Sequence, residues 1–175
     1  MNVDVFEAIK NRRSIRAYKR QDLPAGTIER LLEAATWAPS AGNVQPWFFV
    51  VAAQPETRRN LSLAAYGQRD VEEAPVVVVV CADQKRAQER YGERGKTLYC
   101  IQDTAAAVQN ILLSAWALGL GTCWIGAFKE EQVRKVINAP DGVKPVALIL
   151  VGYPDEAPEP RSKRPLSETT RRETF

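Results

Sequence analysis

The chain of 175 residues contains no histidine. This absence excludes Ser-His and Cys-His nucleophilic catalysis, because both need an imidazole base, and it also excludes metal sites built on histidine. If the protein is an enzyme, its chemistry is therefore expected to come from a bound cofactor.

Cysteine is scarce as well. The three cysteines, Cys81, Cys100 and Cys123, are far apart in the sequence and lie in apolar stretches. A zinc site would need cysteines in closely spaced pairs, which this chain lacks. The pattern indicates reduced cysteines that pack as small hydrophobic side chains in a cytoplasmic protein, with no metal.

The chain also lacks the features of exported, membrane and nucleic-acid proteins. The net charge is only +3, which does not indicate a nucleic acid or a membrane surface as partner. No apolar run approaches the roughly 20 residues needed to span a bilayer, and no secretory signal pattern is visible. With 45% hydrophobic residues, the sequence predicts one domain over residues 1–175, ending in an extended tail from about residue 154.

The regular elements alternate between helices and strands. Apolar runs predict strands at residues 47–53, 76–82, 122–126 and 145–152, and the first two are expected to be buried on both faces. Residues 97–118 are predicted to form a long helix that is apolar over much of its circumference. Such a helix lies either in the centre of a domain or across a subunit interface.

Positive charge is concentrated just after the first predicted helix. Arg12, Arg13 and Arg16 surround Ser14, and guanidinium groups bind phosphate through paired hydrogen bonds. Taken alone, this run also fits a solvated basic loop. It fits nucleic-acid binding less well, because no aromatic residues are interleaved with the basic ones.

A loop of small and amide residues follows at residues 39–46. Gly42 allows a ligand to approach the backbone closely, and the amides of Asn43 and Gln45 can read the edge of a heteroaromatic ring. The alternative is an ordinary loop in which Asn43 bonds its own backbone. The combination of this loop with the arginines favours a site for a planar ligand that carries a phosphate.

Two further segments are candidates. Residues 119–126 end the long helix, turn and enter a strand, with small residues where a flat ligand could lie, but they lack the dinucleotide-binding glycine fingerprint. Arg161, Lys163 and Arg164 form a basic cluster in the tail, which is either solvated or part of a phosphate site.

Five motifs in order resemble the FMN-dependent nitroreductase family over essentially the whole chain. They are Arg-Arg-Ser-x-Arg at residues 12–16, Pro-Ser-Ala-x-Asn-x-Gln-Pro-Trp at 39–47, Ala-Pro before the valine-rich strand, Gly-Leu-Gly-Thr-Cys-Trp-Ile-Gly at 119–126, and Arg-Pro-Leu at 164–166. The resemblance implies an α+β fold with a mixed central sheet flanked by helices. It also implies a homodimer with FMN at the interface and the long helix across it.

By motif match, the resemblance also implies site residues. Arg12, Ser14 and Arg16 would hold the phosphate and pyrimidine side of the flavin, with Arg13 contributing mainly backbone. Four residues would approach the same flavin from the other subunit: Pro39, Ser40, Ala41 and Asn43. Five more would complete the site: Gln68 at the ring, Ile125 and Gly126 near flavin N5, and Arg164 with either Arg161 or Lys163 at the phosphate.

The implied activity is transfer of hydride from NADH or NADPH through FMN to a small organic acceptor, such as a nitroaromatic or a quinone, by a ping-pong scheme. No catalytic side chain is expected, in agreement with the missing histidine. Two alternatives stay open: a flavoprotein of this fold with other chemistry (reductive dehalogenation or flavin breakdown), and a non-catalytic flavin carrier or sensor. The charged segment 85–96 is either a lid over the flavin or a plain surface excursion.

Overall fold

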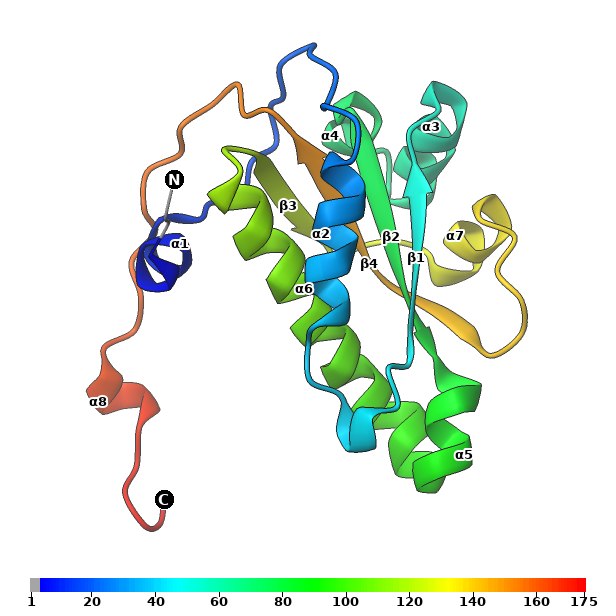
Figure 1. The fold of residues 1–175 in the computed structure, drawn as a ribbon, viewed down its shortest axis with the longest axis vertical. Coiled ribbons are helices and arrows are strands. Elements are labelled where there is room, and N and C mark those ends of the chain that lie inside the picture. Colours follow the sequence, from blue (N-terminus) through cyan, green and yellow to red (C-terminus); the bar gives the residue numbers. More distant parts are fainter. Residues whose placement is uncertain (1–3) are drawn as a thin grey trace.

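The computed structural model of the chain describes residues 4–175, which form one sheet with helices on both faces (Figure 1). The strands are β1 (Trp47–Ala52), β2 (Val76–Asp83), β3 (Gly121–Ile125) and β4 (Val143–Gly152). The α-helices are α1 (Val5–Asn11), α2 (Thr27–Thr36), α3 (Pro55–Ala64), α4 (Arg69–Glu73), α5 (Gln84–Arg94), α6 (Cys100–Ala117), α7 (Glu130–Val136) and α8 (Leu166–Thr169). Two short elements complete the fold: the 3-10 turn η1 (Ala41–Asn43) and the π-helical turn η2 (Gly95–Tyr99).

The sheet has the strand order β1-β2-β4-β3, and all neighbouring strands are antiparallel. The mixed character that the resemblance implies is limited, in the described residues, to one parallel bridge between Ser14 and Thr122 beside β3. Strands β2 and β4 occupy the centre, and β2 is buried almost throughout, as its run of valines predicts.

The two faces of the sheet build two separate cores, because successive side chains of a strand point to opposite faces. Val78 and Val80 pack with Leu31 of α2 and Ile111 of α6 on one face. On the other face, the intervening residues of β2 pack with α3, α4 and α7. Figure 1 shows α2 and α6 crossing the near side of the sheet, with α3, α4 and α7 on the other side.

Strand β1 differs from the prediction. It lies at an edge of the sheet, and Phe48 and Val51 are exposed, so it is not buried on both faces. An apolar run in the sequence does not reveal whether a strand has neighbours on one side or on two, and that difference decides its burial.

The long helix is confirmed as α6, with one change to its predicted burial. Ile111, Leu112 and Ala115 are buried against the sheet, whereas Leu113 and Trp116 on the outward side are only half-buried. Within residues 4–175, α6 therefore carries an apolar outward strip that this single chain does not fully cover.

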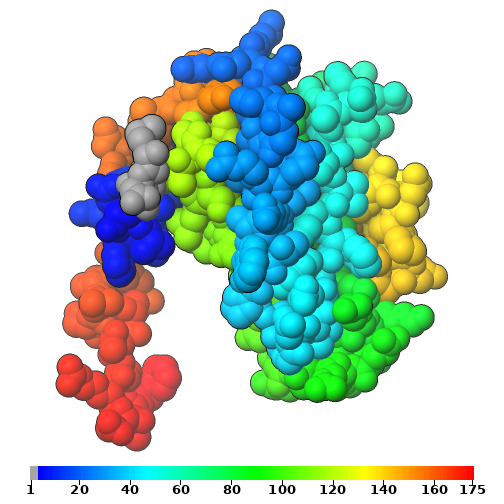
Figure 2. Space-filling view, in the orientation of Figure 1, coloured from blue at the N-terminus to red at the C-terminus, as the bar shows by residue number. Residues whose placement is uncertain are grey.

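The charged segment and the tail also take definite forms. Residues 84–99 are helical, as α5 followed by η2, although most of their charged side chains are exposed. The tail is exposed from residue 159 onward and contains the short helix α8. Figure 2 shows it in orange and red, projecting from the body beyond the blue helix α1. Among the described helices, none combines the length and the hydropathy required to cross a membrane.

Candidate functional site

The arginine segment lies along strand β3. Asp4 caps α1 by accepting a hydrogen bond from the amide of Phe6, and Arg12 follows the last turn of this helix. The amide of Ile15 then donates to the carbonyl of Thr122 at 2.9 Å. A Cβ atom at Gly121 would stand only 2.8 Å from Ile15, so the glycine permits this close approach.

Acidic partners hold Arg16 in place. Its Nε lies 3.7 Å from a carboxylate oxygen of Asp70, and its backbone amide donates to the Glu156 carboxylate in the tail. Arg13 is engaged differently, because its guanidinium donates to the backbone carbonyls of Lys10 and Arg12 at the end of α1. Arg12 and Arg13 are half-buried, whereas Ser14 and Arg16 are exposed to solvent.

Gln68 connects α4 to the end of β3. Its side-chain amide donates to the carbonyls of Ala65 at 2.8 Å and Ala127 at 3.0 Å. Ile125 is buried at the end of β3, and the adjacent Gly126 is exposed. Because Asp70 also contacts Arg16, the structure brings Arg16, Gln68 and Gly126 to the same side of the molecule.

The loop at residues 39–45 is held at a different place, at the amino end of α6. The amide of Ala41 donates to the Asp103 carboxylate at 3.1 Å, and Nε of Arg86 donates to the carbonyl of Val44 at 2.6 Å. Tyr91 of α5 places its hydroxyl against Gly42, at a position that a Cβ atom would fill. The charged segment 85–96, for which the sequence allows either a lid or a surface excursion, thus contacts this loop through Tyr91.

The arginine segment and the loop lie at opposite ends of α6. Asp103, which binds the loop, is in the first turn of the helix, and Gly121, which contacts Ile15, follows its last turn. At 1.5 Å per residue the 18-residue helix is about 27 Å long. A single chain therefore does not bring Pro39, Ser40, Ala41 and Asn43 together with Arg12, Ser14 and Arg16.

The basic residues of the tail are exposed. Arg161, Lys163 and Arg164 lie outside the body of the protein, and Arg164 pairs with Glu168 of α8 at 3.2 Å. Within residues 4–175, no hydrogen bond or ion pair joins these three residues to the arginine segment.

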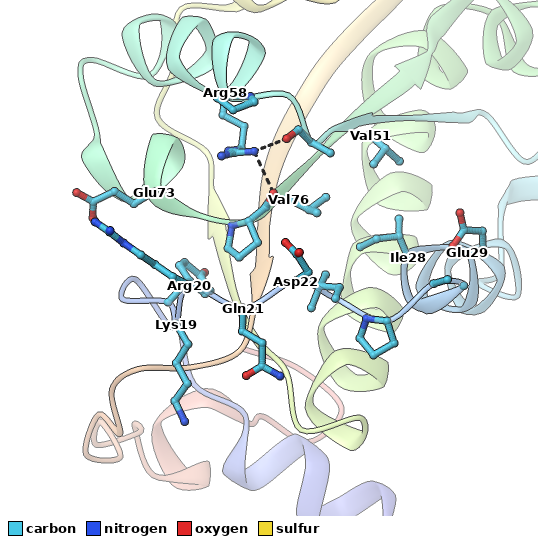
Figure 3. A pocket seen from close by; sticks show the side chains of 18 of the residues that line it. Lys19, Arg20, Gln21, Asp22, Ile28, Glu29, Val51, Arg58, Glu73 and Val76 are labelled. Carbon is cyan, nitrogen blue, oxygen red and sulfur yellow. Dashed lines mark hydrogen bonds between the residues drawn. The ribbon is translucent and has the colours of Figure 1, made fainter.

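Two cavities lie near these elements. One of about 440 Å³ is lined by Arg12, Arg13, Trp116, residues 119–122 and tail residues 154–158, so the arginine segment, the end of α6 and the tail share a hollow. The larger, of about 1210 Å³, lies between residues 18–26, the edge of β1 and helices α3 and α4. Figure 3 shows Arg58 at this second cavity, donating to backbone carbonyls, and none of the predicted site residues lines it.

The titratable side chains of the interior do not provide a nucleophile. Burial raises the pKa of all three thiols, that of Cys81 to about 12, so they stay protonated at neutral pH. Burial also raises the pKa of the Tyr18 hydroxyl, which donates to the Ile15 carbonyl. None of these four groups is therefore ionised at neutral pH.

Sequence reasoning missed the acidic residues that support the site. Asp70, Asp103 and Glu156 contact predicted site residues, yet none was singled out. Asp103 carried a usable signal, because a carboxylate on the buried side of an apolar helix needs a partner. Asp70 and Glu156 lie in ordinary charged stretches and carried none.

Comparison with known proteins gives a consistent result. The sequence model of the nitroreductase family matches residues 9–73 and 63–153. An NADH dehydrogenase of Thermus thermophilus is 35% identical over 191 residues, covering 94% of this chain and 93% of that protein. An FMN reductase (NADPH) of Bacillus subtilis is 34% identical over 164 residues, covering 86% of this chain and 66% of the relative.

Solved structures agree. The NADPH:FMN oxidoreductase of Vibrio harveyi, solved in complex with NAD+, superposes with a TM-score of 0.90 at 25% identity, covering 98% of this chain and 77% of that one. The family model spans most of the chain, and the Thermus relative is similar over nearly its full length. The chain belongs to the nitroreductase family.

Proposed function

We propose that the protein is an FMN-dependent oxidoreductase that moves hydride from NADH or NADPH to a small organic acceptor of the nitroaromatic or quinone type. The observation that carries the proposal is the meeting of the arginine segment, Gln68 and the end of β3 on one side of a nitroreductase-family chain. The flavin reductases among its relatives support the same cofactor.

The donors beside β3 suit the chemistry of FMN. Its phosphate is a dianion, and Arg12, Ser14 and Arg16 would supply two guanidinium groups and a hydroxyl. Of these three residues, Arg12 lines the cavity of about 440 Å³. Arg13 would contribute backbone, because its guanidinium is occupied at α1. The Gln68 amide and the backbone of Ile125 and Gly126 would lie against the ring.

The separation of the two halves of the site supports a homodimer. If a second copy packs on the outward strip of α6, two-fold symmetry places the loop of one chain near the arginine segment of the other. Pro39, Ser40, Ala41 and Asn43 would then complete the partner's site. The exposed Phe6 of α1 and Trp37 at the end of α2 add apolar surface on two elements that contact α6, and a monomer leaves this surface in water.

The tail would contribute the remaining charge. Arg161 and Arg164 are exposed, and among residues 4–175 the ion pair found for them joins Arg164 to Glu168 of the tail, so both could close on a phosphate. The link between Glu156 and the amide of Arg16 ties the start of the tail to the arginine segment. The tail basic residues are therefore tethered within the same region as the predicted phosphate site.

When bound, FMN accepts hydride from the reductant and passes the electrons to the acceptor. The residues of this chain provide position and charge: Arg16 would balance negative charge on the pyrimidine side of the ring, and backbone near Gly126 would orient the ring. No described side chain is needed as an acid or base. Because both substrates use one pocket in turn, the expected kinetics are ping-pong.

Steady-state kinetics test the proposal. With NADPH varied at several fixed concentrations of a quinone, double-reciprocal plots should be parallel, and the same should hold for NADH if it is used. Intersecting lines would contradict the shared pocket. A bound flavin that neither NADH nor NADPH reduces would indicate a carrier or sensor. Turnover that is seen only with a halogenated substrate, or only as oxygen consumption with loss of flavin, would indicate the other chemistries of this fold.

A further inference from the structure

We propose that Asp103 is a positioning residue for the cofactor, which holds the loop at residues 40–45 in the shape that reaches the flavin. The proposal rests on the function proposed above, because it assigns the loop a flavin to contact. Asp103 itself belongs to α6 and touches the loop through its side chain.

The loop has an unusual backbone that needs external support. Gly42, Asn43 and Gln45 all have positive φ values, of 53°, 57° and 54°. Residues other than glycine adopt this left-handed region rarely, and asparagine does so more readily than glutamine. Such conformations persist where the surrounding structure fixes them, and they gather at ligand sites.

Contacts within the loop fix part of this shape. The hydroxyl of Ser40 accepts from the amide of Gln45 at 2.9 Å, and the side chains of Gln45 and Asn43 are bonded at 3.2 Å. These groups are exposed, so water competes for every one of the bonds. The internal bonds therefore do not set the position of the loop on the protein.

Besides the contact of the Tyr91 hydroxyl with Gly42, two side-chain hydrogen bonds found among residues 4–175 attach the loop to the body, and that of Asp103 is the buried one. Its carboxylate accepts from the amide of Ala41 at 3.1 Å, and the residue is only 7% exposed. The second contact, from Arg86 to the Val44 carbonyl, comes from an exposed side chain. Both bonds involve a charged side chain, but water competes less for the buried one, so we take the Asp103 contact as the firmer anchor.

Asp103 has no other evident partner. Among residues 4–175 it forms no ion pair, and the hydrogen bond from Ala41 is the single one found for its side chain. A buried carboxylate without a cation is costly, so its retention calls for a role. Because an acidic residue in the first turn also stabilises a helix, the test below separates helix stability from positioning of the loop.

The test compares three variants of the full-length protein. Asp103→Ala removes the anchor with a good helix former, and Asp103→Asn keeps an oxygen that can accept from the Ala41 amide. Thr104→Val is the matched control, because Thr104 is equally buried but its hydroxyl bonds only carbonyls of its own helix. If Asp103→Ala does not fold, Asp103→Ser replaces it, since a serine hydroxyl is too short to reach Ala41.

Two readouts separate positioning from stability. FMN affinity, measured by quenching of flavin fluorescence, should fall about tenfold or more in Asp103→Ala and stay within about threefold of the parent in Asp103→Asn and Thr104→Val. Amide hydrogen exchange of the flavin-free protein should become faster at residues 41–45 in Asp103→Ala alone.

Several results would overturn the proposal. Unchanged affinity and unchanged loop exchange in Asp103→Ala would show that the anchor is dispensable. If Thr104→Val lost as much FMN affinity as Asp103→Ala, the loss in both variants would be explained by lower stability of α6. If the parent protein itself bound no FMN, the proposed function would fail, while the exchange of residues 41–45 would still decide whether Asp103 holds the loop.

Discussion

Replacing Arg12 and Arg16 together by alanine is expected to give a folded but colourless protein. Both arginines belong to the segment beside β3: Arg12 lines the hollow of about 440 Å³ at the end of α6, and the Arg16 guanidinium lies beside Asp70. A hydrogen bond to a charged group contributes about 1.5–3 kcal/mol, so the loss of two should weaken FMN binding by about 10²- to 10⁴-fold. The flavin absorbance of purified protein, together with its circular dichroism, measures both expectations.

The matched control removes two arginines elsewhere. Arg30 and Arg59 are exposed on α2 and α3, and replacing both by alanine changes the net charge by the same amount. This control should retain FMN. If the Arg12 and Arg16 double variant kept the full flavin content, or if the control lost it equally, then the phosphate would not be held by the arginine segment.

Two defective chains are expected to restore each other. In the arginine variant (Arg12→Ala with Arg16→Ala) the phosphate side is lost. In a loop variant (Gly42→Val with Asn43→Leu) the loop that completes the partner's site is distorted. A valine Cβ at position 42 would overlap the Tyr91 hydroxyl, and the valine backbone would have to keep the positive φ of Gly42. Each homodimer should be colourless, because both of its sites lack one half. A heterodimer of the two variants, purified through two different tags, has one intact site and one site that lacks both halves. It should therefore bind about one FMN.

The control for this experiment places all four substitutions in one chain. Co-expressed with the unaltered chain, that quadruple variant should give a heterodimer in which each site lacks one half, and hence little FMN. If each site were built within one chain, the outcome would be reversed: heterodimers of the two single-region variants would be flavin-free, and heterodimers of the quadruple variant with the unaltered chain would hold about one FMN.

The features of this fold that can be predicted from the sequence are those determined by neighbouring residues in the chain. The valine run of β2 needs burial on both faces whatever its neighbours, so it was predicted correctly. The glycine after α6 ends the helix through its own positive φ of 74°, and this too can be read locally. The arginine segment could be proposed as a site for the same reason, because it concentrates charge in five consecutive residues.

The remainder depends on contacts between distant residues. Strand β1 is partly exposed because it lies at the sheet edge, and residues 84–99 form α5 and η2 with a break in helical geometry at Tyr91 and Gly92. The support given by Asp70 to Arg16, and by Asp103 to Ala41, joins residues 54 and 62 positions apart. Such pairings follow from the packing of α4 and α6, which no short sequence window contains.

The most direct measurement is the visible spectrum of the purified protein before and after anaerobic addition of NADPH. The proposed function predicts the two absorbance bands of oxidised flavin, close to one FMN per chain in the denatured extract, and rapid bleaching of the longer-wavelength band by the reductant. A folded protein without flavin, even after incubation with excess FMN, would contradict it.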